Sequence, residues 1–181
     1  MAIVNNSETM MRLIGENWPD ALASQSGIVV SIQRLARLFQ RISATALEPL
    51  GLTPHEFELL ATLRSHPAPH QLTPSSLYDS MLMSSGGLTK LLKTLEARSL
   101  VHRPQSAGDR RSRPVALTAE GRVIAESAMR AVQRAEAPLI EEMTTPQSST
   151  DELAERLIAL VAAAEARFAT LTRRRMPAGG L

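Results

Sequence analysis

The chain has 181 residues, 44% of them hydrophobic and 21% charged, a balance typical of one globular domain with added helical arms. Its formal net charge is +2, and it has no cysteine, which excludes disulfides, thiolate zinc sites and cysteine nucleophiles. Residues 1–7 lack the basic start and apolar run of a secretory signal, and the longest apolar stretch, residues 157–164, is too short to cross a bilayer. We therefore expect a cytoplasmic protein without a membrane partner.

The first two elements in chain order are a polar extension and a long helix. Residues 1–20 are interrupted by Gly15 and Pro19, and only residues 8–14 favour a short helix. From Ile28 to Ala46, apolar residues recur at alternating steps of four and three, which places them on one face of a helix. This helix should end before the next proline and glycine.

Two threonine–proline pairs mark the next helix starts. Thr53 precedes a proline and stands three residues before Glu56, so the sequence predicts a capping box and a helix to about residue 64. Thr73 also precedes a proline and opens a short helix over residues 75–80.

A third helix is predicted from a cap at Ser84 to about Arg98. Its inward face carries Leu88, Leu91, Leu92 and Leu95. Its outward face is small, polar and basic and consists of Gly86, Thr89, Lys90, Lys93 and Ala97. A short helix followed by a second helix with such a face is typical of a helix-turn-helix.

The segment that follows is predicted to be a β-hairpin. Extended runs at residues 100–103 and 113–117 flank a basic, glycine-bearing stretch, so the hairpin would form a wing whose arginines suit the minor groove. Residues 84–122 hold eight basic and three acidic side chains, a net charge of +5 against −3 for the remainder. This distribution favours a polyanion partner, and the alternative is a solvated loop with spare arginines.

The last part of the chain predicts two more helices. Apolar positions after Thr118 indicate a helix that is bent or broken near Pro138, and residues 149–152 form a capping box that opens the final helix. Striped helices at both ends of the chain, with no domain of their own, favour pairing with a second copy, although they could instead close the monomer's own core. The expected dimer-interface residues are Ile28, Ile32, Leu35, Leu153, Leu157, Leu160 and Ala164.

Three stretches resemble the MarR family of winged-helix transcriptional regulators: residues 52–60, residues 84–101, and residues 109–112 followed by 117–121. The resemblance implies a mainly α fold with a small β-wing, in which a winged helix-turn-helix domain is joined to N- and C-terminal dimerisation helices. The implied organisation is an N-terminal extension (1–20), a first dimerisation helix (21–48), the DNA-binding lobe (52–121), C-terminal dimerisation helices (122–172) and a flexible tail (173–181).

The resemblance also implies roles for individual residues. Asp109 would pair with Arg111 and hold the wing in shape, while Arg110 or Arg111 reaches the minor groove. The whole expected DNA-binding set is Ser84, Ser85, Gly86, Thr89, Lys90, Lys93, Asp109, Arg110, Arg111 and Arg113.

The stretch from Trp18 to Asp20 and the stretch from Ser84 to Gly86 look most like the PecS and urate-responsive branch of the family. This likeness implies a small aromatic, phenolic or urate-like anion as effector. The candidate ligand-binding residues are Trp18, Glu58 and His55, and the alternative for His55 is a surface or half-buried histidine without a ligand. The alternative is that Trp18 only fastens the extension to the dimer.

We therefore expect a homodimeric, sequence-specific DNA-binding regulator, a repressor that binds a palindromic double-stranded operator and is released by a small ligand. The alternative is a helical protein-interaction or metabolite-binding module without DNA function. The sequence has no glycine-rich phosphate loop, nucleophile elbow or recognisable catalytic carboxylate pair, so we expect no enzyme and no cofactor. His66 and His70 are separated by prolines and cannot form a helical two-histidine face, so no metal is expected.

Overall fold

The computed structural model describes residues 7–21, 24–81, 85–104, 114–144 and 149–175. It forms two compact units, Met1–Glu136 and Ala137–Leu181, each treated separately below. Within the described ranges, no helix combines the length and the apolar character needed to cross a membrane.

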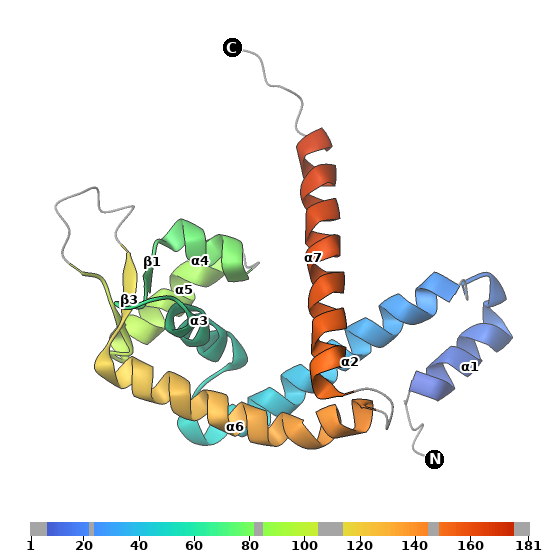
Figure 1. Ribbon diagram of the computed structural model, residues 1–181, viewed down its shortest axis with the longest axis horizontal. Helices are drawn as coiled ribbons and strands as arrows, with labels where there is room; N and C mark the ends of the chain where they lie inside the picture. Colours follow the sequence, from blue (N-terminus) through green and yellow to red (C-terminus); the bar gives the residue numbers. More distant parts are fainter. Residues whose placement is uncertain (1–6, 22–23, 82–84, 105–113, 145–148, 176–181) are drawn as a thin grey trace, which may run out of the picture. The chain divides into compact units, whose positions relative to one another are not determined.

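The first unit begins with helix α1 (Ser7–Asn17), a 3-10 turn η1 (Pro19–Ala21) and the long helix α2 (Ser24–Leu47) (Figure 1). The apolar stripe of α2 is exposed near the start of the helix and partly buried near its end. Ile28 and Ile32 are each 62% exposed, whereas Phe39 and Ile42 are half-buried and Leu47 is fully buried. The end of α2 therefore joins the core of this unit, through Leu47 and the last stripe residue, Ala46.

A sharp corner joins α2 to helix α3 (Pro54–Ser65) through the 3-10 turn η2 (Glu48–Leu50). Gly51 has a left-handed backbone (φ 61°), and two backbone bonds, from Gly51 to Glu48 and from Leu52 to Leu47, complete a Schellman motif. The predicted capping box of α3 is confirmed, because Glu56 N donates to Thr53 Oγ1 and Thr53 N donates to the Glu56 carboxylate.

The winged lobe continues with helices α4 (Pro74–Met81) and α5 (Ser85–Ala97) and three short strands. Strands β2 (Val101–His102) and β3 (Val115–Leu117) pair antiparallel, with Val101 opposite Leu117. Strand β1 (Gln71–Leu72) pairs with the other edge of β3, so the sheet order is β1-β3-β2. The sequence predicted the hairpin but not β1, since two residues are too few to show an alternating pattern.

The core of this lobe is built mainly from leucines. Leu59, Leu60, Leu63, Leu77 and Leu95 are fully buried. Each buried leucine contributes roughly 1.5–3 kcal/mol relative to an exposed one. These side chains come from α3, α4 and α5, so the core itself holds the three helices together.

Helix α6 (Ala119–Met143) begins tightly against the end of α5. Thr118 Oγ1 accepts from Gly121 N at 2.9 Å and donates to Ser99 O at 2.8 Å. A Cβ on Gly121 would lie 1.9 Å from the carbonyl oxygen of Leu100, so only glycine fits there. Further along, Ser43 Oγ of α2 donates to Glu136 at 2.7 Å and ties α2 to α6.

The helical pattern after Thr118 is confirmed. Of the two expectations near Pro138, the break is wrong and the bend stays a prediction. The helix α6 runs on to Met143 with Pro138 inside it. A proline costs its helix one backbone hydrogen bond, and here the helix continues despite that loss.

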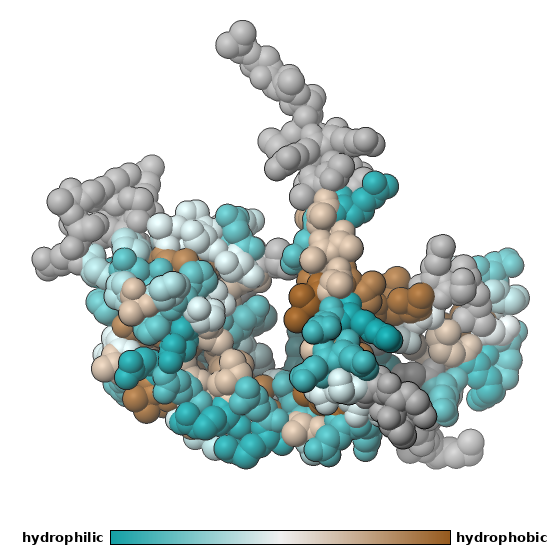
Figure 2. Space-filling model, viewed as in Figure 1, coloured by the Kyte–Doolittle hydropathy of each residue, from teal (hydrophilic) through white to brown (hydrophobic). Residues whose placement is uncertain are grey.

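The second unit contains the end of α6 and helix α7 (Thr150–Arg175). Ser149 and Glu152 form the predicted capping box, with each backbone N–H donating to the other side chain at 3.2 Å. Residues 173–175, expected to be tail, are helical, and residues 176–181 lie outside the described part. Large apolar side chains along α7 are open to solvent (Figure 2), including Leu157, Ile158, Leu160, Val161 and Phe168.

Candidate nucleic-acid interface

Helix α5 is amphipathic as the sequence predicts. Leu88, Leu92 and Leu95 are 4%, 3% and 0% exposed and fix this helix on the core. The opposite face, consisting of Gly86, Thr89, Lys90, Lys93 and Ala97, is exposed. The buried leucines thus hold both lysines outward.

The two lysines are free to meet an external anion. Within the described ranges, neither Lys90 nor Lys93 forms an ion pair or a side-chain hydrogen bond. No described residue lies within 4 Å of a Cβ placed on Gly86, so the described part of the chain leaves room for a partner at the first turn of α5. Ser85 opens this helix, whereas Ser84 lies outside the described residues.

Two arginines of the basic stretch are engaged within the fold. Arg103 Nε donates to Glu96 Oε1 at 2.7 Å. Arg98 Nη1 donates to Gly51 O at 2.9 Å and to Glu56 Oε1 at 3.3 Å. The charge count alone could not separate these arginines from the unpaired lysines, because their acceptors are fixed only by the fold.

The expected wing is described only at its base. Antiparallel β2 and β3 place His102 opposite Ala116, so the chain leaves and re-enters the sheet on neighbouring strands. The remaining expected DNA-binding residues, Asp109, Arg110, Arg111 and Arg113, lie outside the described residues.

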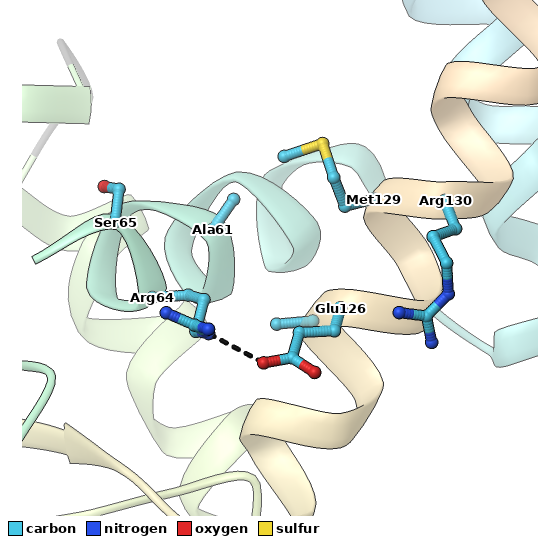
Figure 3. A pocket seen from close by; sticks show the side chains of 7 residues that line it. Ala61, Arg64, Ser65, Glu126, Met129 and Arg130 are labelled. Atoms are coloured by element: carbon cyan, nitrogen blue, oxygen red, sulfur yellow. Dashed lines mark hydrogen bonds and ion pairs between the residues drawn. The ribbon is translucent and has the colours of Figure 1, made fainter.

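A hollow of about 370 Å³ lies between α3 and α6 (Figure 3). It is lined by Ala61, Arg64, Ser65, Ala125, Glu126, Met129 and Arg130. Arg64 Nε donates to Glu126 Oε1 at 2.9 Å across it. The hydrogen bond from Arg64 lowers the pKa of Glu126 below 4.5, and the charges of Arg64, Arg122 and Arg130 act in the same direction.

The three candidate ligand-binding residues lie elsewhere. Trp18 is 68% exposed, and His55 and Glu58 form an exposed pair on α3 with 3.5 Å between Nδ1 and Oε2. None of the three lines the hollow between α3 and α6. Their role in ligand binding stays a prediction.

The expected dimer-interface residues share one property, which is that none belongs to the buried core of the described residues. Ile28, Ile32 and Leu160 are 62–66% exposed, and Leu157 is 46% exposed. Ala164 is exposed, and Leu35 and Leu153 are half-buried. Exposed apolar side chains in such numbers are typical of an interaction surface.

Comparison with known proteins agrees with this architecture. The MarR family model matches residues 50–112. The HTH-type transcriptional repressor Rv2887 of Mycobacterium tuberculosis is 32% identical over 126 residues, which cover 70% of this chain and 88% of the repressor. The HTH-type transcriptional regulator PecS of Dickeya dadantii is 31% identical over 103 residues, 57% of this chain, and the match covers 62% of PecS.

Solved structures show the same fold. A MarR mutant from E. coli, complexed with operator DNA, superposes with a TM-score of 0.62 at 25% identity, covering 83% of this chain and 97% of that one. The Rv2887 complex with salicylic acid gives a TM-score of 0.58 at 32% identity, covering 71% and 92%. The helix order, the three-stranded sheet, and these identities establish that the chain is a winged helix-turn-helix protein that belongs to the MarR family.

Proposed function

We propose that the protein is a homodimeric transcriptional regulator, not an enzyme, and that it represses by binding a palindromic operator in the cytoplasm. The observation that carries the proposal is the two exposed lysines on the outer face of α5, the second helix of the helix-turn-helix, which have no partner among the described residues. The repressor names of its relatives support the same role.

The dimensions of α5 suit the major groove. Its 13 residues span about 20 Å at 1.5 Å per residue, and the groove is about 12 Å wide. Lys90 and Lys93 would reach phosphates or guanine edges, and Gly86 would let the helix approach the duplex closely. In a symmetric dimer, two copies of α5 would enter half-sites about 34 Å apart.

Selection from a random duplex library, followed by fluorescence anisotropy on the selected duplex, tests the proposal. Lys90→Ala and Lys93→Ala should each weaken binding. Each phosphate contact that is lost should lower the salt slope of log K by about 0.9. Arg37→Ala is the matched control, because Arg37 is an exposed cation on α2 and should leave both quantities unchanged.

The wing is tested in the same assay. Neutralising Arg110 and Arg111 together should flatten the salt dependence of binding, and an unchanged slope would remove the wing from the interface. Failure of the library to yield any preferred duplex would reject the DNA function and leave the interaction or metabolite-binding module.

The effector part of the proposal is a small aromatic or phenolic acid in the hollow between α3 and α6. The relative Rv2887 has been solved with salicylic acid. In this chain, two guanidinium groups, Arg64 and Arg130, stand beside the apolar surface of Ala61, Ala125 and Met129. An acid would bind by competing with Glu126 for Arg64, so the ion pair limits its affinity.

The effector proposal is tested by calorimetric titration with salicylate and with urate. Each compound is then added to the DNA complex in the anisotropy assay. Salicylate should bind and weaken the DNA complex, and Arg130→Ala should reduce its affinity. Intact DNA binding with no heat from either compound would remove the effector while keeping the DNA function.

A further inference from the structure

Arg98 connects the end of α5 to a distant part of the chain. It directly follows α5, and its Nη1 donates both hydrogens inward, to Gly51 O at 2.9 Å and to Glu56 Oε1 at 3.3 Å. These acceptors precede it by 47 and 42 residues and belong to the α2–α3 corner and to α3. One nitrogen atom therefore joins three elements.

Among the described residues, Glu56 is the charged residue that is buried, and 7% of its side chain is exposed. Its Oε2 accepts from Thr53 N at 2.8 Å and from Thr53 Oγ1 at 3.0 Å, and its Oε1 accepts from Arg98. Both carboxylate oxygens are satisfied, so the buried charge is fully compensated only while Arg98 is in place.

The helix ends reinforce this arrangement. Gly51 O lies at the C-terminal end of η2, where a cation is favourable, and Glu56 lies in the first turn of α3, where an anion is favourable. Arg98 fills the position between them with its side chain 35% exposed.

The hydrophobic contacts of α5 are less directional than the hydrogen bonds of Arg98. Leu88, Leu92 and Leu95 hold the helix on the core, but hydrophobic contact has no preferred angle and tolerates small shifts. Hydrogen bonds weaken steeply when distance or angle changes. Lys93 stands five residues before Arg98, about 7.5 Å along the helix, so a shift at Arg98 moves the lysine as well.

We propose that Arg98 and Glu56 form a positioning bracket, which sets the placement of α5 on the α2–α3 corner and on which sequence-selective DNA binding depends although neither residue touches DNA. The inference rests on the proposed function of α5. It gives Arg98 a role within the protein, because both hydrogens of its Nη1 are donated to Gly51 and Glu56.

The main test is the double variant Arg98→Met with Glu56→Gln. It removes the bracket without leaving a buried charge, and glutamine can still cap α3. We expect at least tenfold weaker binding to the selected duplex. Binding to a random duplex of equal length should change less than twofold, with the same salt slope as the wild type.

The matched control is Arg103→Met with Glu96→Gln, which removes an ion pair near the same end of α5. Its arginine is as exposed as Arg98, 35%, and its acid is exposed (33%) where Glu56 is buried (7%). It should keep the preference for the selected duplex within twofold. Arg98→Lys, which keeps the charge but loses the planar donor group, should fall between the wild type and the double variant.

A second measurement is independent of DNA. Since the chain has no cysteine, Arg37→Cys on α2 and Thr94→Cys on α5 give two unique sites for spin labels. Their distance distribution, measured by pulsed electron resonance in samples diluted with unlabelled protein, should shift or broaden in the double variant and stay unchanged in the control.

The outcomes separate the two levels of the proposal. An unchanged distance distribution in the double variant overturns the bracket, whatever happens with DNA. A changed distribution with full preference for the selected duplex also overturns it. If the wild type selects no duplex but the double variant changes the distance distribution, the positioning role of Arg98 is supported and the proposed DNA function is rejected.

Discussion

Two residues with left-handed backbones end helical segments in the same way. Gly51 (φ 61°) follows η2, and Ser99 (φ 56°) follows α5, each completing a Schellman motif with paired backbone bonds. Glycine adopts this conformation at no steric cost, whereas serine does so against the contact between its Cβ and the backbone. The end of α5 is therefore under a small strain that the end of η2 avoids.

Ser99→Gly should stabilise the protein by about 0.5–1 kcal/mol, because it relieves that strain. The reciprocal change, Gly51→Ser, should destabilise it by about 1 kcal/mol. Urea denaturation followed by circular dichroism measures both. Effects of equal sign at the two positions would contradict this explanation.

Gly121→Ala should cost at least about 2 kcal/mol, because the new methyl group would overlap the carbonyl of Leu100 and force α6 away from the end of α5. Gly86→Ala is the matched control. It lies in the first turn of α5, where a Cβ would have nothing among the described residues within 4 Å, and the change should not lower the stability. A tolerated Gly121→Ala would show that the start of α6 can move freely.

At the scale of elements, helix α3 is tied to α6 by the ion pair between Arg64 and Glu126. The folded pKa of Glu126 is lowered below 4.5, chiefly by the hydrogen bond from Arg64. The stabilisation is therefore present above the unfolded pKa and is lost as the pH falls through the folded value.

Glu126→Gln should lower the melting temperature at pH 7 and leave it unchanged at a pH below the folded pKa, where the wild-type carboxyl is also neutral. Thermal melts across this range measure the difference. Glu155→Gln, which removes an exposed carboxylate on α7, is the control and should leave the melting temperature at pH 7 unchanged. A difference that persists in acid would mean that the substituted amide disturbs packing and that the ion pair is not the cause.

The elements that the sequence predicted are those with local signals. Thr53 and Ser149 have their capping partners three residues away, and the leucines of α5 repeat within one helix. The bracket between Arg98 and Glu56 was missed, because its partners are 42 residues apart and Glu56 already had a local explanation as a cap. The strand β1 was missed for the related reason that only its pairing with β3 defines it.

At the scale of the whole molecule, the exposed apolar side chains on α7 offer a surface for a second copy. Leu157, Leu160 and Val161 are 46–66% exposed and lie on one face of the helix by their spacing. A second copy would cover this face in a symmetric interface, as the proposed function requires.

The pair Leu157→Glu and Leu160→Glu should convert the protein to a monomer in sedimentation equilibrium. Its affinity for a palindromic duplex should fall at least a hundredfold, because a monomer engages one half-site. The pair Ala159→Glu and Ala162→Glu adds the same charges at exposed positions on the opposite face and should leave the dimer intact. A dimer that survives the first pair would place the interface elsewhere.

The carboxylate of Glu56 serves two partners at once, and this has a consequence for how the family can diverge. A lineage that loses the arginine at position 98 inherits an uncompensated anion, and one that loses the acid at position 56 also loses the closure of its helix cap. In an alignment of descendants, positions 56 and 98 should therefore change together. Glutamine at position 56 should occur mainly where position 98 is no longer basic.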